Sequence, residues 1–306
     1  MVVTLRALGL GDLLAAVPAL RAVRRAFPAE RHLLAAPAAL EPLARLSGAV
    51  DAVVDTAPLA PLAPVLHGAD VLVNLHGRGP QSHGVALAAA PHRLIAFAHP
   101  DIPETAGAPA WRAGEHERDR WCRLLRECGI PADPGDVRLP EPDVAPPPQA
   151  VGATVVHPGA AAPARRWPPE RFAALARAER QAGRPVVVTG SAAEAPLARR
   201  VAEAAGLPAG AVLAGRTDLL GLAATIAAAR RVVSGDTGVA HLAVAFGIPS
   251  LTLFGPIPPS EWGPPPGGRH RVLWGGRRGD PHADRVDPGL YAIEVPEALD
   301  ELRRAS

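Results

Sequence analysis

Residues 232–241 read Val-Val-Ser-Gly-Asp-Thr-Gly-Val-Ala-His, the pattern of a buried strand, a tight turn and the first turn of a helix. The two glycines allow the backbone to approach a ligand closely, and Asp236 suits the N-cap position of the helix. Free N–H groups and the positive end of a helix dipole attract an anion at such a place. Thr237 and His241 are four residues apart and lie on one helix face. The motif predicts an anion site, with a capped structural helix as the alternative.

A second strand-to-helix turn occupies Gly9-Leu10-Gly11-Asp12. It superficially looks like a dinucleotide-binding fingerprint, but Leu14 stands where the third glycine would be. No acidic residue ends the next strand, within residues 32–37, so a Rossmann dehydrogenase is disfavoured. Asp12 is interpreted either as a helix N-cap or as a carboxylate at an interdomain cleft, where it would act as a general base on a hydroxyl.

Two arginines, Arg165 and Arg166, precede Trp-Pro-Pro and follow the loop His157-Pro158-Gly159. A guanidinium at this position could bind a phosphate through two N–H groups and stabilise a departing diphosphate. In an arginine-rich chain, two solvated side chains are the simpler interpretation of the pair taken alone.

An aromatic and proline-containing loop runs from Phe254-Gly255-Pro256 to Trp262-Gly263-Pro264, after a predicted strand. Its rigidity would suit the wall of a nucleotide pocket. An ordinary proline-rich connection fits the same residues.

The composition describes a chain that folds into more than one domain and carries little net charge. Its 306 residues favour two domains, and 48% hydrophobic residues suffice for two cores. A formal net charge of +2 does not indicate nucleic-acid binding. All 32 basic residues are arginines, which we attribute to a GC-biased codon usage, and Schiff-base chemistry is therefore excluded.

Several site types and locations are disfavoured by missing patterns. The chain has no lysine-containing phosphate loop, no Gly-x-Ser-x-Gly elbow, no Asp-x-Asp pair and no apolar run of the ~20 residues needed to cross a bilayer. Arg6 and Asp12 interrupt any signal-peptide core, and the two cysteines are interpreted as reduced cytosolic thiols. Four histidines, His76, His83, His92 and His99, lack metal-ligand spacing and are expected to be solvated or near the acceptor, so no metal site is predicted.

Strand and helix patterns alternate along the whole chain, which predicts an α/β fold with two doubly wound, mainly parallel sheets. Residues 140–149 contain five prolines and predict a semi-rigid spacer. We therefore expect domains at 1–148 and 149–306, with the last helix as a candidate to pack back on the N-terminal domain. A ligand is expected at the carboxyl ends of the strands, in the cleft between the domains.

The predicted elements are short strands and longer helices. The expected strands are 2–6, 32–35, 52–54, 71–74, 93–97, 153–157, 185–189, 211–213, 231–234 and 250–254, and the expected helices are 12–27, 115–128, 169–182, 192–205, 218–229 and one that starts at Thr237.

Taken together, the motifs resemble glycosyltransferase family 9, the ADP-heptose–lipopolysaccharide heptosyltransferase family, over nearly the whole chain. The matching landmarks, in order, are Gly11-Asp12-Leu13-Leu14, Pro18-Ala19-Leu20-Arg21, Phe27-Pro28, Asn74-Leu75-His76-Gly77, residues 93–97, His157-Pro158-Gly159, Arg166-Trp167-Pro168, Gly190-Ser191 with Glu194, Asp236-Thr237-Gly238 with His241, Phe254-Gly255-Pro256 and Trp262-Gly263-Pro264.

The resemblance implies a GT-B fold, with an acceptor-binding N-terminal domain and a nucleotide-sugar-binding C-terminal domain that face a central cleft. It implies an inverting transfer of a heptose-like sugar from a nucleotide diphosphate sugar, ADP-heptose, to a hydroxyl of a glycan or glycolipid. Neither a cofactor nor a metal is implied, and the location is cytoplasmic with at most peripheral membrane contact.

The resemblance also implies roles for individual residues. Asp12 is the general base and Arg165 stands near the leaving diphosphate. The donor-binding set is Gly11, Glu194, Asp236, Thr237, Gly238, His241, Gly255 and Pro256, in which Glu194 contacts the ribose. The family usually has Lys where this chain has Arg165, which keeps the charge but changes reach and shape. A binding-only relative and a sugar-nucleotide epimerase of the same fold are the alternatives, and the acceptor and the oligomeric state are left open.

Overall fold

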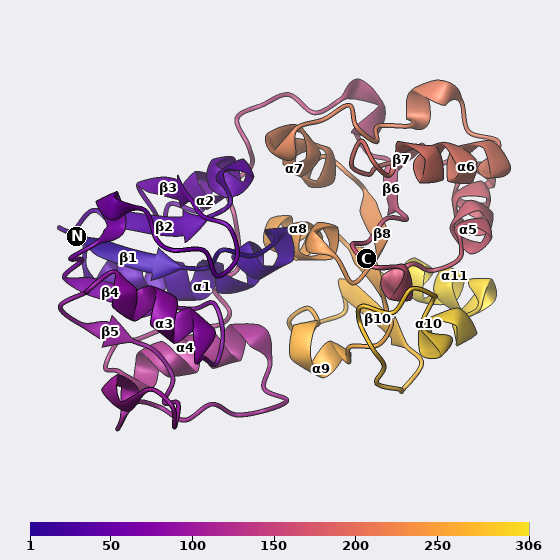
Figure 1. Ribbon diagram of the computed structural model, residues 1–306. Coiled ribbons are helices and arrows are strands. Elements are labelled where there is room, and N and C mark those ends of the chain that lie inside the picture. Colours follow the sequence, from indigo (N-terminus) through magenta and orange to yellow (C-terminus); the bar gives the residue numbers. More distant parts are fainter. Residues whose placement is uncertain (306) are drawn as a thin grey trace. The chain divides into compact units, whose positions relative to one another are not determined.

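The computed structural model describes residues 1–305 and divides the chain into two compact units, Met1–Val137 and a second that starts at Arg138. Each unit contains one five-stranded parallel sheet (Figure 1). The strand orders are β3-β2-β1-β4-β5 in the first unit and β10-β9-β8-β6-β7 in the second. Both orders are those of doubly wound α/β sheets, so the predicted fold class is confirmed.

The first unit starts with the strand β1 and places helices between the following strands. Its strands are β1 (Val2–Leu5), β2 (His32–Ala36), β3 (Ala52–Asp55), β4 (Val71–Asn74) and β5 (Leu94–Ile95). Its helices are α1 (Leu10–Ala26), α2 (Glu41–Leu46), α3 (Gln81–Ala88) and α4 (Glu117–Glu127), with the 3-10 turns η1 (Ala38–Leu40), η2 (Pro64–Leu66) and η3 (Pro103–Thr105).

The second unit repeats the alternation with more helices. Its strands are β6 (Thr154–His157), β7 (Val186–Val188), β8 (Arg231–Gly235), β9 (Ser250–Phe254) and β10 (His270–Trp274). Its helices are α5 (Pro169–Gln181), α6 (Ala195–Ala205), α7 (Leu219–Ala227), α8 (Gly238–Phe246), α9 (Pro259–Trp262), α10 (Pro288–Ala292) and α11 (Val295–Arg304), with the 3-10 turns η4 (Pro148–Ala150), η5 (Pro163–Arg165) and η6 (Ala209–Ala211).

The central strands of both sheets are buried along their whole length, because helices cover both faces of a parallel sheet. All four residues of β1 and of β6, and all five of β8, are buried. Trp167 is fully buried in the core of the second unit and meets Phe172 edge to face, with ring centroids 5.1 Å apart. Each sheet therefore has its own core, which holds the strand ends in fixed register.

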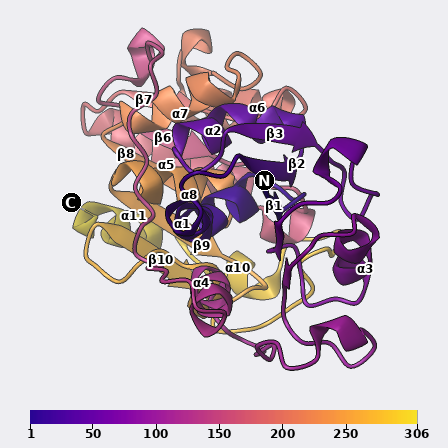
Figure 2. The same ribbon diagram turned by 90° about the vertical axis from the view of Figure 1, so that its left-hand side faces the viewer.

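The last helix, α11, packs against β10, β9 and α5 of the second unit (Figure 1, Figure 2). A hydrogen bond also connects β8 to α11: Arg231 Nη1 donates to the carbonyl of Leu302 at 3.1 Å. The helix that the sequence left as a candidate for the N-terminal domain is thus part of the C-terminal core.

The segment before the proline-rich spacer belongs to the second unit. The backbone N–H of Leu139 donates to the carbonyl of Ala245 at 3.0 Å, and Arg138 Nη1 contacts the carbonyl of Val244 at 3.5 Å. The division at Val137 therefore precedes the expected boundary at residue 148. The assignment of an acceptor domain and a donor domain stays a prediction.

One predicted strand is wrong and one strand was missed. Residues 211–213 follow the 3-10 turn η6 and pair with β7 only through the single bridge between Val188 and Val212. A turn at Gly215 ends this segment before a ladder can form. Strand β10 lies beyond the last predicted element and completes the sheet beside β9. No helix within residues 1–305 has the length and apolar character needed to cross a membrane.

Gly215→Ala is expected to destabilise the fold more than Gly206→Ala. Both glycines have positive φ, +71° and +69°, so an alanine carries the same left-handed strain of about 1–2 kcal/mol at either site. A Cβ at Gly215 would lie 2.9 Å from the backbone Cα of Ala192, whereas at Gly206 the nearest atom is the flexible end of Arg180 at 3.4 Å. Urea unfolding of both variants measures the difference, and equal losses would contradict this packing.

Candidate functional site

The carboxyl ends of β6, β7, β8 and β9 gather most of the predicted binding residues in the second unit. In the sheet register, His157 at the end of β6 is opposite Ser234, and Gly235 at the end of β8 is opposite Leu253. Because the strands are parallel, the loops that follow them lie at the same edge. This edge is the place where open α/β sheets bind ligands.

The turn between β8 and α8 has the geometry of an anion site. Helix α8 begins at Gly238, and its N-cap is Thr237, so the expectation that Asp236 is the N-cap is wrong by one position. Asp236 is buried, and its backbone N–H donates to the carbonyl of Leu253 at 3.2 Å, which holds the turn against β9. The first N–H groups of α8 have no partners within the helix, and they follow a turn that is held in place. This arrangement suits the binding of an anion.

Unpaired polar atoms surround the same turn. The hydroxyls of Thr237 and Ser234 and the Nε of Arg165 are buried without a hydrogen-bond partner among residues 1–305. A buried polar group without a partner costs about 1–3 kcal/mol. Two of these groups belong to the end of β8 and the N-cap of α8, and the third belongs to the loop whose backbone packs on Gly235, so all three could donate to a ligand bound at this turn.

Arg165 reaches this turn because η5 packs directly on the end of β8. A Cβ on Gly235 would lie 2.9 Å from the carbonyl oxygen of Arg165, so only glycine admits this approach. Arg165 is half-buried, and Arg166 is half-buried with its Nε donating to the carbonyl of Ala160 at 2.9 Å. Neither is a freely solvated side chain, and Arg165 is the one whose Nε has no partner among residues 1–305.

The aromatic loop after β9, residues 255–264, packs against one side of α8. The Trp262 ring at the end of α9 meets the His241 ring, with centroids 5.9 Å apart and planes 74° apart. The loop is anchored by two further bonds: Trp274 Nε1 donates to the carbonyl of Gly255 at 3.0 Å, and the carbonyl of Pro256 accepts the N–H of Gly279 at 3.1 Å. The loop thus packs on the predicted binding residue His241.

Glu194 lies at the N-cap of α6, in the loop after β7. Its carboxylate accepts the N–H of Ser191 at 2.8 Å and the hydroxyl of Ser191 at 2.9 Å. Burial acts to raise the pKa of this carboxyl, but the Ser191 N–H and the neighbouring His157 and Arg166 outweigh burial, and the pKa is lowered. Glu194 is therefore a fixed, ionised acceptor at the same sheet edge.

Asp12 occupies the first turn of α1 in the first unit, two residues after the helix starts. The N-cap of α1 is Gly9, so Asp12 is not the N-cap, although its Oδ2 accepts the Gly9 N–H at 3.2 Å. Gly11 precedes it in the same turn. The other carboxylate oxygen, Oδ1, accepts from Arg6 Nη2 at 3.0 Å. The side chain keeps 28% exposure, so a substrate hydroxyl can reach it.

Arg6 links Asp12 to a second acidic side chain that the sequence analysis did not identify. This arginine is 1% exposed, and its Nη2 also donates to Glu117 Oε1 at 2.8 Å, while Nη1 donates to the carbonyl of Leu75. Glu117 accepts a further bond from Trp121 Nε1 at 2.9 Å. The signal for Arg6 in the sequence is a charged residue at the end of a buried apolar strand, predicted over residues 2–6.

The network acts on the acidity of Asp12. Burial is the largest effect and raises the pKa of the Asp12 carboxyl. Arg6 lowers this pKa and Glu117 raises it, and the result is a pKa above the ordinary value. A carboxylate with a raised pKa is a stronger base than a carboxylate with the ordinary pKa. It therefore takes a proton from a hydroxyl more readily.

The histidines of the first unit behave differently from one another. His83 lies within α3 and is fully buried: Nε2 donates to the carbonyl of Phe97 at 2.7 Å, and Nδ1 accepts from Asn74 at 3.2 Å. Of the two expectations for His83, solvated or near the acceptor, the first is wrong, because β4 and Phe97 provide its partners, and the second stays a prediction. His76 is half-buried, and burial and then Arg6 lower its pKa. Residues 1–305 contain no group of three metal-ligating side chains.

Comparisons with known proteins identify the relatives of this chain. Residues 114–288, more than half of the chain, match the sequence profile of glycosyltransferase family 9 (heptosyltransferase). Lipopolysaccharide heptosyltransferase 1 of Pseudomonas aeruginosa is 35% identical over 158 residues, which cover 50% of this chain and 43% of that protein. The chain therefore spans less than half the length of this curated relative.

Two solved structures share the fold over nearly the whole chain. The ADP-heptose lipopolysaccharide heptosyltransferase II of Escherichia coli matches with a TM-score of 0.74 and 21% identity, and covers 99% of this chain and 98% of its own. The E. coli heptosyltransferase WaaC with ADP matches with a TM-score of 0.73 and 19% identity, and covers 100% and 99%. These likenesses confirm the GT-B fold with Rossmann-like domains.

Glu117→Gln is expected to lower the pKa of the Asp12 carboxyl, because it removes a negative charge that raises that pKa. Carbon-detected NMR titration of the carboxyl groups, assigned with Asp12→Asn, measures the change. Glu115→Gln is the matched control, since Glu115 pairs with Arg123 at 2.7 Å and does not act on Asp12. An unchanged or raised Asp12 pKa in Glu117→Gln would contradict the network.

Proposed function

The chain belongs to glycosyltransferase family 9, and we propose that it transfers a heptose-like sugar from ADP-heptose to a hydroxyl of a glycan or glycolipid, with inversion at the anomeric carbon. The proposal rests chiefly on one observation. The N-terminus of α8, with the buried and unpaired Thr237 hydroxyl, meets the backbone of the Arg165 loop at the end of β8, and the Arg165 Nε–H is also buried without a partner among residues 1–305. Related structures carry ADP or an ADP-heptose analogue.

The diphosphate of the donor is assigned to the β8–α8 turn. The backbone N–H groups of Thr237 and Gly238 donate to phosphate oxygens, and the Thr237 hydroxyl adds a third donor. Asp236 shapes the turn through its backbone bond to β9, and His241 lines the same helix face beside Trp262. Gly255 and Pro256 place the aromatic loop beside the nucleotide, and Glu194 accepts hydrogen bonds from the ribose. Gly11, in the first unit, borders the transferred sugar.

The chemical step is a direct displacement. Asp12 accepts the proton of the acceptor hydroxyl while the acceptor oxygen bonds to the anomeric carbon. The bond between that carbon and the diphosphate oxygen breaks, and its electron pair leaves with ADP. Arg165 and the positive end of α8 stabilise the added negative charge on the departing diphosphate. The guanidinium takes the place that Lys occupies in the family and offers phosphate a two-pronged contact.

The acceptor is assigned to the first unit, in which the Asp12 carboxylate is partly exposed. Arg6 and Glu117 position that carboxylate without contacting the substrate. We place the reaction in the cytoplasm with at most peripheral membrane contact, a location supported by the free thiols of Cys122 and Cys128. No cofactor or metal is assigned. Arg165 and the N-terminus of α8 stabilise the negative charge of the diphosphate.

Thr237→Val tests the donor site. The lost hydroxyl is expected to weaken ADP binding about 2–10-fold, the worth of one hydrogen bond, as measured by calorimetry. Folding stability should stay equal or rise, because the substitution removes a buried hydroxyl without a partner among residues 1–305. Thr225→Val is the control: its hydroxyl donates to the carbonyl of Gly221 at 2.7 Å, so this variant loses stability and keeps ADP affinity.

The two variants therefore give opposite patterns if the turn binds the diphosphate. Unchanged ADP affinity in Thr237→Val, or a loss of affinity equal to that in Thr225→Val, would contradict the assignment.

Asp12→Asn tests the catalytic base. We expect kcat to fall by about 10²–10⁴-fold, because the amide cannot accept the proton, while ADP affinity stays unchanged. The assay follows acceptor-dependent release of ADP from ADP-heptose over a panel of glycan and glycolipid acceptors. Asp101→Asn, which changes a largely exposed carboxylate in the same unit, should keep full activity.

The same assay separates the alternative functions. Full activity in Asp12→Asn would overturn the role of the base. ADP binding without turnover on any acceptor would indicate a binding-only relative, and isomerisation of ADP-heptose without an acceptor would indicate an epimerase.

A further inference from the structure

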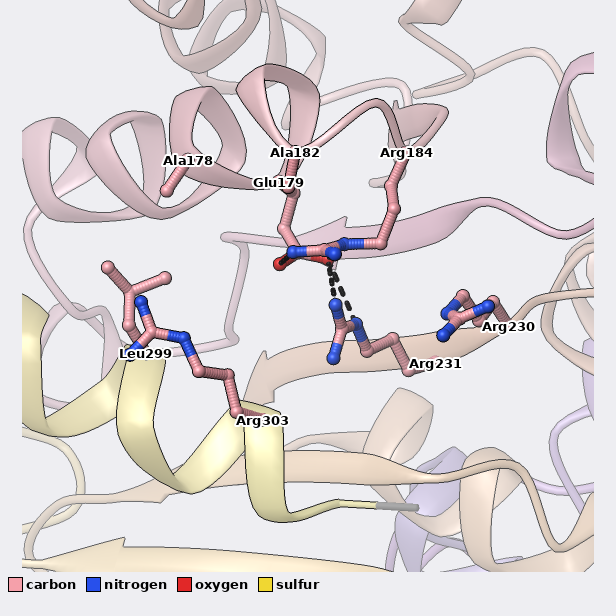
Figure 3. Close-up of a pocket in the computed structure, with 8 residues that line it drawn as sticks. All are labelled: Ala178, Glu179, Ala182, Arg184, Arg230, Arg231, Leu299 and Arg303. Carbon is pink, nitrogen blue, oxygen red and sulfur yellow. Dashed lines mark hydrogen bonds and ion pairs between the residues drawn. The ribbon is translucent and has the colours of Figure 1, made fainter.

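A cavity of about 430 Å³ opens at the other end of the second sheet, away from the proposed donor site (Figure 3). It lies between the end of α5, the start of β8 and α11. Four of its eight lining residues are arginines, and the lining is Ala178, Glu179, Ala182, Arg184, Arg230, Arg231, Leu299 and Arg303. No step of the proposed transfer uses any of these side chains.

The cavity and the donor site lie at opposite ends of the same strand. Arg231 is the first residue of β8, and Gly235, beside the anion turn, is the last. Four steps along a strand span about 13 Å. A ligand in the cavity is therefore separate from a diphosphate at the N-terminus of α8.

The cavity has one buried carboxylate, and two guanidiniums share it. Glu179 is 2% exposed and lies between Arg184 and Arg231 (Figure 3). Arg184 approaches its carboxylate oxygens at 2.8 and 2.9 Å, Arg231 at 2.6 and 2.9 Å, and Thr154 donates its hydroxyl at 2.7 Å. One negative charge thus faces two positive charges, and one positive charge is left without compensation.

Two further arginines add to this excess. Arg230 is exposed beside Arg231 at the cavity. Arg303, on α11, is 65% exposed and pairs with Asp300 at 2.7 Å on its own helix. An exposed pair of this kind contributes little to stability, so Arg303 can exchange its partner. Counting the lining alone, four guanidiniums face a single carboxylate.

We propose that this arginine cavity is a second anion site, which binds a phosphate group. Arg230 and Arg303 are not bonded to Glu179, and each can offer phosphate a planar N–H fork with two parallel bonds. The forks of Arg184 and Arg231, in contrast, already contact Glu179 and add positive charge. Arg184 and Arg231 are already oriented by Glu179, so binding does not have to order them. The apolar side chains Ala178, Ala182 and Leu299 complete the lining of the cavity.

The charges around Arg231 act on its acidity in the expected directions. Burial is the first cause that lowers its pKa, Glu179 opposes this, and Arg184 and Arg230 lower it further. A phosphate dianion in the cavity would offset that repulsion. The inference does not depend on the proposed transferase activity, since it uses none of the donor or acceptor residues.

The phosphate can be free in solution or can belong to a lipid headgroup, and both present the same oxygens. The test uses the full-length protein and inorganic phosphate, titrated against chloride at constant ionic strength. The Nε–H signals of Arg184 and Arg231 in ¹⁵N NMR spectra report binding at this cavity and separate it from any binding at α8. We expect these signals to shift with saturation.

The variant Arg230→Gln/Arg303→Gln removes two positive charges and keeps every bond to Glu179. It should weaken phosphate binding at these signals by about tenfold or more, the worth of losing charge-assisted hydrogen bonds. Arg199→Gln/Arg200→Gln is the matched control: it removes the same charge from α6 and should leave the affinity within about twofold. Signals that do not move, or equal loss in both variants, would overturn the proposal.

A second experiment, with lipid vesicles, identifies the source of the phosphate. Sedimentation with vesicles of phosphatidylcholine and phosphatidylglycerol is measured for the wild type and both double variants. Vesicle binding that is lost only in Arg230→Gln/Arg303→Gln assigns the cavity to a lipid headgroup. Phosphate binding without vesicle binding assigns it to a soluble phosphate compound.

Discussion

Parallel strand direction is the constraint on which the rest of this structure depends. When all five strands of a sheet point the same way, every strand-to-helix turn falls at one edge and every helix presents its N-terminus there. In the second unit this brings His157, Ser234 and the start of α8 to the same edge, and Gly235 admits the Arg165 loop. The candidate site is thus a consequence of topology as much as of any one residue.

Two charge networks stand out: the first balances two guanidiniums with two carboxylates, and the second has one carboxylate for two guanidiniums. In the first unit the guanidinium of Arg6 is shared by the carboxylates of Asp12 and Glu117, and Arg120 pairs with Glu117 from the other side. In the second unit the carboxylate of Glu179 is shared by two guanidiniums. Breaking such a network by removing one partner typically costs about 3–5 kcal/mol. The first network holds a carboxylate that can accept a proton, and the second presents excess positive charge.

Sequence patterns predicted the parts of the fold that depend on local order. Alternating buried strands and amphipathic helices define doubly wound sheets, and the β8–α8 turn is recognisable because its glycines and Thr237 lie within a few residues. The partners of Asp12 were not predictable in this way: Arg6 and Glu117 are 111 residues apart and meet only through packing of α1 against α4. The expected strand at 211–213 failed because a short apolar run does not reveal that the chain turns at Gly215 after a single bridge to β7. The single-residue shift of the N-cap to Thr237 reflects backbone angles that composition leaves undetermined.

The central claim is that the N-terminus of α8 binds the diphosphate of the donor. Amide NMR with added ADP tests it most directly, because the N–H groups that bind phosphate move strongly to lower field. The largest shifts on saturation with ADP are expected at Thr237 and Gly238, with the Arg165 Nε–H among the affected side chains. Saturable ADP binding whose largest shifts lie elsewhere, with Gly238 unmoved, would contradict the account.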